Sequence, residues 1–317
     1  MIESAINYKK ILADIRSRAI AIAQGEWLEL GALVNNILPS PLNPMILLTV
    51  ATGTAVGSNS SALIDIAAII VLADMSLRII DDCADQDNPY ALYKSIGVGQ
   101  AINYAIALNT LTIRELVNIK IPTQKLASLT NGYFHSFLKV CQGQERDIKR
   151  TAKSLEEYQE IVKFKTIPAY EFAAYAGAQI TSSDINLIEL CSNCGTHLGW
   201  MTQILDDIES LWFPIITNSL AEAKMNFPIL FGLKLDHPAS QLLKQQQTTQ
   251  GYDRIQLCAL LDEMHVRTRL INLALDHRDR AITLLDNCVN PAGSKILRLW
   301  LDWLWRDGER LLKAKAL

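Results

Sequence analysis

Apolar residues recur at every third or fourth position along almost the whole chain, as at Ala101, Ala105, Leu108 and Leu111. This spacing places apolar side chains on one face of an α-helix, and no convincing alternating run typical of a strand competes with it. Glycine and proline are sparse, at 15 and 10 of 317 residues, which disfavours turn-rich β architectures. The sequence therefore predicts an all-α fold of roughly ten or more helices joined by short loops.

Turn-forming residues mark the expected ends of these helices. Examples are the stretches 39–44 and 235–238, and the Ser-Ser-Asp sequence at 182–184 predicts an N-cap before a helix that begins near Ile185. No such stretch is long enough to be an interdomain linker, and no repeat of fixed period is visible. We therefore expect a single domain that spans residues 1–317.

Composition excludes several classes of protein. Half of the residues are apolar, 20% are charged and the net charge is −3. Such a chain can bury enough surface to fold, and it lacks the positive charge with which nucleic-acid-binding proteins neutralise phosphates. The apolar stretches 42–57 and 64–80 are too short or carry charges, so we predict no transmembrane span. Six cysteines are too few for a disulfide scaffold and no secretory signal pattern is visible, which indicates a reducing, cytoplasmic compartment.

Two groups of acidic residues close two of the predicted apolar helices. Asp81, Asp82 and Asp85 form the first group, and Asp206 and Asp207 belong to the second. Asp81 and Asp85 point from one helix face, where like charges destabilise an isolated helix. One explanation is a solvated C-terminal turn. The other is a set of ligands for Mg²⁺, which prefers hard oxygens and is often shared between one or two carboxylates and a substrate phosphate.

Isolated cations lie among otherwise apolar residues. Lys165 stands beside Thr166 at the start of an apolar segment, and Lys224 precedes another. Each lysine alone is compatible with a surface residue whose aliphatic stem covers apolar neighbours. Together they indicate a site for an anion. Its further polar members would be Gln144, Asp147 and Gln203.

Five short motifs follow one another between residues 63 and 230. They are Asp81 to Asp85 (DDCAD), Gly143 to Asp147 (GQERD), Lys165 with Thr166, Gly199 to Asp207 (GWMTQILDD) and Lys224. Their order resembles that of the trans-isoprenyl diphosphate synthases. The resemblance implies an isoprenoid-synthase helical bundle around a central apolar cavity, with Mg²⁺ and an allylic isoprenoid diphosphate held at its mouth.

The resemblance also implies roles for individual residues. The implied metal ligands are Asp81, Asp82, Asp85, Asp206 and Asp207. The implied ligands of the diphosphate are Lys165, Thr166, Gln144 and Lys224. Gln203 and Thr166 would flank the reacting carbon and stabilise the carbocation. The expected catalytic group comprises Asp81, Asp82, Lys165, Gln203 and Asp206.

Residues just before the first acidic motif bear on substrate length. By resemblance, Ser76 and Leu77 belong to the pocket that sets chain length, and because neither is aromatic they permit a C15 or C20 chain. Asp74 and Arg78 lie on the same stripe, where an apolar wall is expected. They form either an i, i+4 ion pair that faces another helix or, in the case of Arg78, a replacement cation that binds the diphosphate.

Two cationic motifs of the chain-elongating synthases are missing. The stretch 40–45 reads SPLNPM and the stretch 88–93 reads NPYALY, so neither holds a lysine or an arginine. A second diphosphate would lack its usual partners there, so the acceptor is expected to differ from isopentenyl diphosphate. The run from Asp81 to Tyr93 instead resembles the divergent branch of pheromone-modifying prenyltransferases, which attach an isoprenoid to a tryptophan of a peptide.

The sequence thus predicts a Mg²⁺-dependent enzyme that ionises an allylic isoprenoid diphosphate and transfers the prenyl group to an aromatic or peptide acceptor. We also expect a homodimer. Two alternatives stay open. The first is a class I terpene cyclase, because Ser210 partly matches the metal triad of those enzymes, although Pro214 replaces the final glutamate of that triad. The missing cations would also suit a non-catalytic partner subunit of a prenyl diphosphate synthase, although such a subunit has no evident need for Asp81, Asp82 and Asp85.

Overall fold

The computed structural model describes residues 2–38, 44–57, 61–86, 88–149, 152–213, 226–248, 253–299 and 301–302. These residues form helices and no strand, which confirms the predicted all-α fold. The helices are α1 (Ile2–Glu26), α2 (Leu28–Ile37), α3 (Pro44–Val56), α4 (Ser61–Asp85), α5 (Leu92–Ile96), α6 (Val98–Asn118), α7 (Thr123–Ile148), α8 (Leu155–Lys165), α9 (Ile167–Thr181), α10 (Ile185–Trp212), α11 (Phe227–Lys234), α12 (Pro238–Thr248), α13 (Arg254–Glu263) and α14 (Val266–Asp286). Within these ranges, no helix has both the length and the apolar content that a membrane crossing requires.

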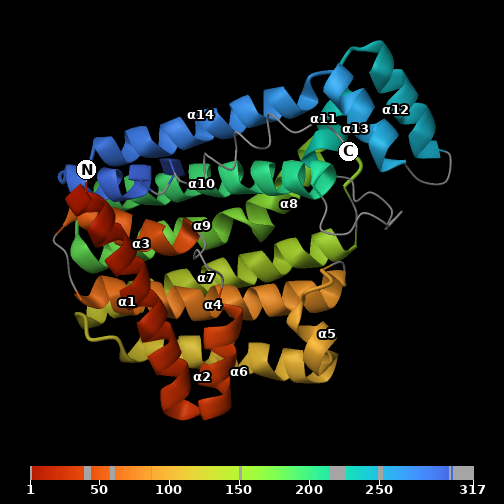
Figure 1. Cartoon of the computed structure of the whole chain (residues 1–317). Helices are drawn as coiled ribbons and strands as arrows, with labels where there is room; N and C mark the ends of the chain where they lie inside the picture. Colours follow the sequence, from red (N-terminus) through yellow and green to blue (C-terminus); the bar gives the residue numbers. More distant parts are fainter. Residues whose placement is uncertain are drawn as a thin grey trace.

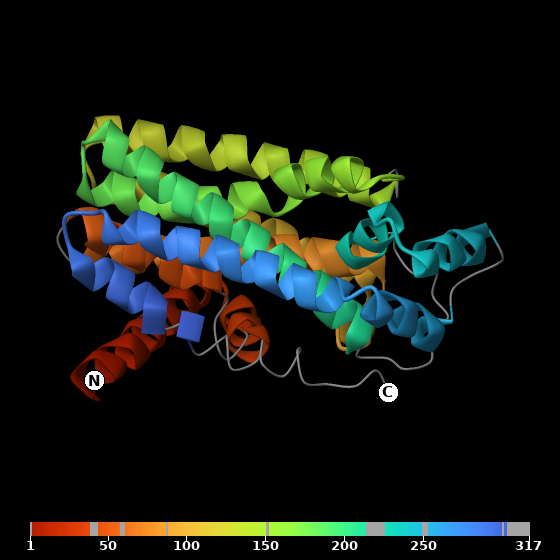
Figure 2. The same cartoon turned by 90° about the horizontal axis from the view of Figure 1, so that it is seen from above.

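The long helices lie side by side in a bundle (Figure 1). α10 packs against α9 and α14, α9 also packs against α3, and α4 packs against α6. Figure 2 shows the same bundle from above, with α14 along one face and the shorter helices α11, α12 and α13 gathered at one end. The buried apolar side chains of the described residues form one continuous cluster.

Polar side chains fix where three helices of the bundle begin. Asp184 caps α10 by accepting hydrogen bonds from two backbone N–H groups, which confirms the predicted N-cap. Ser154 caps α8 by accepting a hydrogen bond from the backbone N–H of Glu157 at 3.2 Å, and Asn226 caps α11. Each cap satisfies N–H groups that have no partner within the helix, so it sets the register of the residues that follow.

Two glycines let helices approach closely beside the site described below. A Cβ atom on Gly143 of α7 would lie 2.2 Å from the backbone nitrogen of Lys165, at the end of α8. A Cβ atom on Gly195 of α10 would lie 2.4 Å from the carbonyl oxygen of Tyr170 in α9. Both distances are far below van der Waals contact, so these approaches require glycine. Gly143 therefore holds the last turns of α7 against the end of α8.

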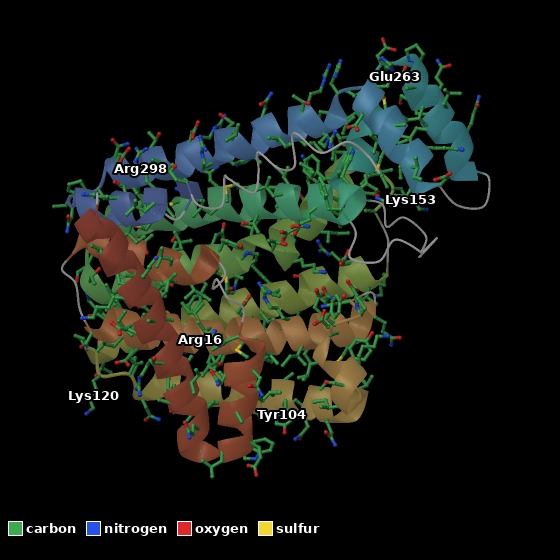
Figure 3. All side chains as sticks on the ribbon, viewed as in Figure 1. Arg16, Tyr104, Lys120, Lys153, Glu263 and Arg298 are labelled. Carbon is green, nitrogen blue, oxygen red and sulfur yellow. The ribbon has the colours of Figure 1, made fainter. Side chains whose placement is uncertain are left out.

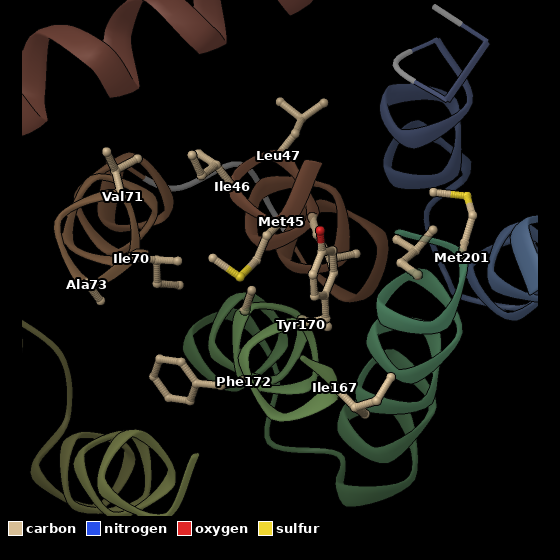
Figure 4. Packing of buried hydrophobic residues seen from close by; sticks show 14 of the residues in the cluster. Met45, Ile46, Leu47, Ile70, Val71, Ala73, Ile167, Tyr170, Phe172 and Met201 are labelled. Atoms are coloured by element: carbon tan, nitrogen blue, oxygen red, sulfur yellow. The ribbon is translucent and has the colours of Figure 1, made fainter. Parts of the chain in front are cut away.

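The interior between α3, α4 and α9 is built from aliphatic and aromatic side chains (Figure 4). Met45 of α3, Ile70 of α4 and Phe172 of α9 point toward a shared space there, and each is more than nine-tenths buried. Complete burial of such a side chain contributes about 1.5–3 kcal/mol to folding. This packing gives the apolar interior from which the candidate site opens.

Candidate active site

An apolar pocket lies between α4 and α7, and residues of α3 and α9 complete its lining. The pocket is partly open, and the space within it amounts to about 360 Å³ when its open, solvent-filled part is included. The lining positions on α4 and α7 recur at three- and four-residue intervals, so the pocket follows both helices over several turns. They are Ile70, Ala73, Asp74 and Leu77 on α4 and Tyr133, Ser136, Phe137 and Val140 on α7. The pocket matches the apolar cavity expected inside the bundle.

The next turns of the same helices carry the residues of the sequence motifs. Leu77 is followed one turn later by Asp81 on α4, and Val140 is followed one turn later by Gln144 on α7. The polar motifs therefore lie one helical turn beyond the apolar pocket on both helices. In Figure 3 this end of the bundle is the one where Lys153 is labelled, just before α8.

Lys165 connects the first acidic motif to α7. Its Nζ atom lies 3.1 Å from Oδ1 of Asp81 and 2.5 Å from Oδ2 of Asp147. Burial lowers the pKa of this ammonium, but the two carboxylates outweigh burial and the pKa is raised above its ordinary value. Lys165 is therefore a protonated cation at neutral pH, held between an acid of α4 and an acid of α7.

Asp82 and Asp85 complete the first acidic motif. Asn88 donates a hydrogen bond from Nδ2 to Oδ1 of Asp82 at 3.2 Å. The charge of Asp85 reaches Lys165 and adds to the rise in the pKa of the ammonium. All three acids of the motif therefore belong to the same mouth of the pocket.

Asp206 and Arg78 bring the second acidic motif to this mouth. Asp206 is exposed, yet the protein around it restricts its hydration and raises the pKa of its carboxyl to about 7; the charge of Asp207 adds to the rise and that of Arg78 opposes it. The Nε atom of Arg78 lies 2.9 Å from Oδ2 of Asp74, so the i, i+4 ion pair is present. The charge of Asp74, supported by that of Asp206, raises the pKa of this guanidinium. Arg78 therefore links the pocket wall to the second acidic motif.

Asp207 is placed differently from Asp206. Its Oδ2 accepts hydrogen bonds from the hydroxyl of Tyr158 at 2.7 Å and from the backbone N–H of Phe227 at 3.1 Å, and its Oδ1 accepts one from Nε2 of Gln203 at 2.9 Å. Burial raises the pKa of the Asp207 carboxyl to about 6, while these donors act in the opposite direction. Both oxygens of this expected metal ligand are thus engaged by protein donors.

The polar residues expected to contact the diphosphate or the reacting carbon lie at the same end. Thr166 donates a hydrogen bond from Oγ1 to Oε1 of Gln203 at 2.5 Å, so the third and fourth motifs meet. The Nε2 atom of Gln144, on the same helix as Asp147, is buried and has no acceptor among the described residues. Lys224 lies outside the described residues.

The two residues expected to set chain length have different surroundings. Leu77 lines the pocket. Ser76 is buried against α6 instead, where its hydroxyl donates to the carbonyl oxygen of Ala105 at 2.8 Å. Adjacent residues of a helix point about 100° apart, so only one of the two faces the pocket.

Tyr158 belongs to the site although the sequence analysis did not single it out. It precedes Lys165 by seven residues, which places both on one face of α8, and this spacing was the only signal available. Its partner Asp207 lies on α10, and no spacing within the sequence reveals a contact between different helices. The buried phenol therefore became visible only in the structure.

The mouth of the pocket combines three kinds of group. Carboxylates of α4 and α10 offer hard oxygens, Lys165 and Gln144 offer donors to an anion, and the pocket offers an apolar wall for a hydrocarbon chain. Within the ranges that the structure describes, no three His, Cys, Asp or Glu side chains form a cluster that could hold a metal ion by themselves. The carboxylates suit a cation that is shared with a bound phosphate.

The family model described as polyprenyl synthetase matches residues 42–261 of the chain, a range that contains both acidic motifs. The chain belongs to the polyprenyl synthetase family. This membership confirms the resemblance predicted from the five motifs.

Similar proteins of this family include a tryptophan prenyltransferase, as the resemblance to the divergent branch predicted. This protein, ComQ of Bacillus subtilis subsp. natto, is 32% identical over 158 residues, which are 50% of this chain and 48% of that protein. The geranylgeranyl diphosphate synthase of Sulfolobus acidocaldarius is 29% identical over 184 residues, or 54% of each chain. The chain thus spans about half the length of these curated relatives.

Solved structures of polyprenyl synthetases share the fold. The decaprenyl diphosphate synthase of Rhodobacter capsulatus superposes with a TM-score of 0.77 at 15% sequence identity, and the superposition covers 95% of this chain and 98% of that chain. The likeness extends over almost the whole bundle, including the part that follows α10.

Proposed function

We propose that this polyprenyl synthetase ionises an allylic isoprenoid diphosphate and transfers the prenyl group to an acceptor other than isopentenyl diphosphate. The observation that carries the proposal is the convergence of Asp81, Lys165 and Asp206 at the mouth of an apolar pocket. An anionic head and a hydrocarbon tail are the two parts of an isoprenoid diphosphate. The mouth suits the first part and the pocket suits the second.

The donor chemistry at the mouth fits magnesium. Asp81, Asp82, Asp85 and Asp206 would hold magnesium together with the bound diphosphate, since they offer the hard oxygens that the ion prefers but do not form a complete ligand set by themselves. Oδ1 of Asp81 faces the Lys165 ammonium at 3.1 Å, so a bound ion would share this carboxylate with the lysine. When bound, magnesium would supply positive charge that stabilises the departing diphosphate as its negative charge grows.

The protein's own residues bind and orient the substrate. Lys165 and Gln144 would bind the diphosphate, together with Arg78 and with Lys224. Their interactions with the leaving group strengthen as the C–O bond breaks, which lowers the barrier to ionisation. Thr166 and the carbonyl oxygen of Gln203 would lie beside the positive carbon, and the apolar wall would keep water away from it.

The proposed acceptor is an aromatic side chain, such as tryptophan in a peptide. Two observations support it: the lack of lysine and arginine in the stretches 40–45 and 88–93, and the similarity to the tryptophan prenyltransferase ComQ. We propose a C15 or C20 donor because Leu77, which lines the pocket, is not aromatic.

We also propose that two copies of the chain associate through α6 and α7 in the cytoplasm. Ile102 and Ile106 are exposed one turn apart on α6, as are Phe134 and Leu138 on α7. Leu138→Glu should give a monomer in sedimentation experiments, whereas Leu242→Glu, at an exposed position of α12, should not. All six cysteines are free thiols, which supports a reducing compartment.

The test of the activity is direct. The purified chain is incubated with Mg²⁺ and geranyl, farnesyl or geranylgeranyl diphosphate, with and without a tryptophan-containing peptide, and diphosphate and organic products are measured. We expect a prenylated peptide. Abundant cyclic hydrocarbon without peptide would indicate a terpene cyclase instead, and no diphosphate release under any condition would contradict catalysis.

A matched pair of variants tests the assignment of the acids. Asp81→Asn should abolish diphosphate release. Asp65→Asn should not, although Asp65 lies on the same helix, is similarly exposed at 39% against 43%, and is likewise paired with a cation, Arg18. Equal activity of the two variants would contradict the assignment.

A further inference from the structure

The amide of Gln203 sits in a hydrogen-bond network that joins four segments of the chain. Its oxygen, Oε1, accepts from Thr166 Oγ1 at the start of α9. Its nitrogen, Nε2, donates to Oδ1 of Asp207 at 2.9 Å and to the hydroxyl of Tyr158 at 3.2 Å. Tyr158 belongs to α8, and Asp207 also accepts from the first backbone N–H of α11, that of Phe227. Every polar atom of the amide therefore has a protein partner.

The chemistry of these partners allows one orientation of the amide. An ionised carboxylate only accepts hydrogen bonds, so the NH₂ group of Gln203 and not its carbonyl oxygen must face Asp207. The hydroxyl of Tyr158 donates to Oδ2 of Asp207 at 2.7 Å, which leaves its oxygen to accept from Gln203. If the amide turned over, its oxygen would face a carboxylate and its NH₂ group would lose two acceptors. Polar groups buried without a partner are costly, so the network disfavours the turned state.

Burial strengthens the preference for this orientation of the Gln203 amide. Tyr158 is 8% exposed and Asp207 is 7% exposed. The Tyr158 ring also packs perpendicular to the ring of Phe227, with ring centroids 6.2 Å apart, so water has little access to the pair. In such surroundings a hydrogen bond that is lost on rotation cannot be replaced by one to solvent. The phenol and the carboxylate therefore hold each other as well as the amide.

We propose that Tyr158 and Asp207 are positioning residues that fix the side-chain amide of Gln203 with its carbonyl oxygen toward the reacting carbon. The inference deepens the proposed function and rests on it. In that reaction the C–O bond of the allylic diphosphate breaks, its electron pair leaves with the diphosphate, and the carbon becomes positive. A carbonyl oxygen stabilises this charge, whereas an NH₂ group in the same place would repel it. Asp207 thus serves the reaction through Gln203 and not as a metal ligand.

The first experiment separates positioning from binding. With farnesyl diphosphate and Mg²⁺ as the probe, Tyr158→Phe and Asp207→Asn should each lower kcat for diphosphate release about tenfold or more. The dissociation constant of farnesyl thiodiphosphate, whose C–S bond resists ionisation, should change less than about twofold. Tyr175→Phe is the control, because its phenol lies on α9 near Ser128 and outside the network. It should change neither quantity. A loss of affinity as large as the loss in kcat would overturn the proposal.

The second experiment tests whether Tyr158 acts through Gln203. Gln203→Leu should lower kcat, and adding Tyr158→Phe to that variant should lower it less than about twofold further, because the oriented group is already gone. If Tyr158→Phe lowers kcat by the same factor with and without Gln203→Leu, Tyr158 acts by another route. Circular dichroism melting curves accompany each variant, and Asp207→Asn serves in the same cycle should Tyr158→Phe not fold.

A third measurement does not depend on turnover. In the full-length protein labelled with ¹⁵N at glutamine, the side-chain NH₂ protons of Gln203 should exchange slowly with solvent, and Tyr158→Phe should accelerate the exchange at least tenfold. Fast exchange in the unsubstituted protein would overturn the proposed orientation even if the enzyme is active. Conversely, slow exchange in a protein that releases no diphosphate would leave the orientation standing and contradict the proposed function alone.

Discussion

The Nζ atom of Lys165 lies 3.1 Å from Oδ1 of Asp81, so an ammonium at the end of α8 meets a carboxylate at the end of α4. Lys165→Met keeps the aliphatic stem and removes this charge. We expect kcat/KM for diphosphate release to fall about a hundredfold or more, because the cation no longer stabilises the leaving group. Lys163→Met is the control, since Lys163 is exposed on the same helix and pairs with Glu160. Equal loss in both variants would show that net charge matters and not this contact.

Gly143→Ala tests the close approach of α7 and α8. The new methyl group would lie 2.2 Å from the backbone nitrogen of Lys165, so the helices must separate. We expect a loss of about 1–3 kcal/mol in the free energy of unfolding, together with a lower affinity for diphosphate. Gly99→Ala in α6 meets no atom within 4 Å and should be neutral or slightly stabilising, by up to about 1 kcal/mol. Urea denaturation measures both, and a neutral Gly143→Ala would contradict the packing.

Asp74 lines the pocket and pairs with Arg78, so the two charges should depend on each other. Arg78→Leu leaves the Asp74 carboxylate, which is 16% exposed, without its partner beside apolar groups. We expect a loss of about 1–3 kcal/mol in stability from this change. The double variant Asp74→Leu with Arg78→Leu should recover most of it, because apolar replacement of a whole pair is often neutral.

The exposed i, i+4 pair Arg280 and Asp276 provides the comparison for that cycle. Its single variants should each change stability by less than about 1 kcal/mol, as is usual for surface pairs. If Arg78→Leu also changes stability by less than about 1 kcal/mol, the Asp74 carboxylate does not face a poorly hydrated pocket.

Stability should also fall on acidification through a pair of histidines outside the site. His197 of α10 and His277 of α14 approach to 2.9 Å between their Nδ1 atoms, so one ring donates and the other must be neutral to accept. Burial, aided by His197, lowers the pKa of His277 to about 4. The folded protein therefore binds this proton more weakly than the unfolded chain does. The contribution of neutral His277 to the free energy of unfolding is complete above pH about 6.5 and is lost as the pH falls toward 4.

Melting temperatures between pH 7 and pH 4 measure this effect. His277→Gln should flatten the pH dependence by comparison with His135→Gln, a control at an exposed position of α7. An unchanged slope in His277→Gln would show that other groups dominate acid destabilisation.

The sequence was sufficient to predict the helices and the two acidic ends, because both follow from local patterns. Periodicity marks helical faces, and Asp184 marks the start of α10 through the chemistry of a single side chain. The motif order also predicted that Lys165 and Asp81 would share a site. These predictions needed no knowledge of distances between helices.

Other features of the site depend on contacts that no local pattern encodes. Asp206 and Asp207 are adjacent and chemically identical, yet one is exposed at the mouth and the other is buried, because one residue along a helix turns the side chain by about 100°. Tyr158 gains its role only from the packing of α8 against α10 and α11. For the same geometric reason Ser76 faces α6 while its neighbour Leu77 lines the pocket.

The hydrogen bond from the first N–H group of α11 to Asp207 has a consequence for anyone who alters this protein. The same carboxylate holds the Gln203 amide, so the docking of α11 and the alignment of that amide share one anchor. Replacing α11 by the matching helix of another polyprenyl synthetase would therefore disturb the Gln203 amide as well as the packing of the new helix. The replacement helix would have to present a backbone N–H group to residue 207 in the same position.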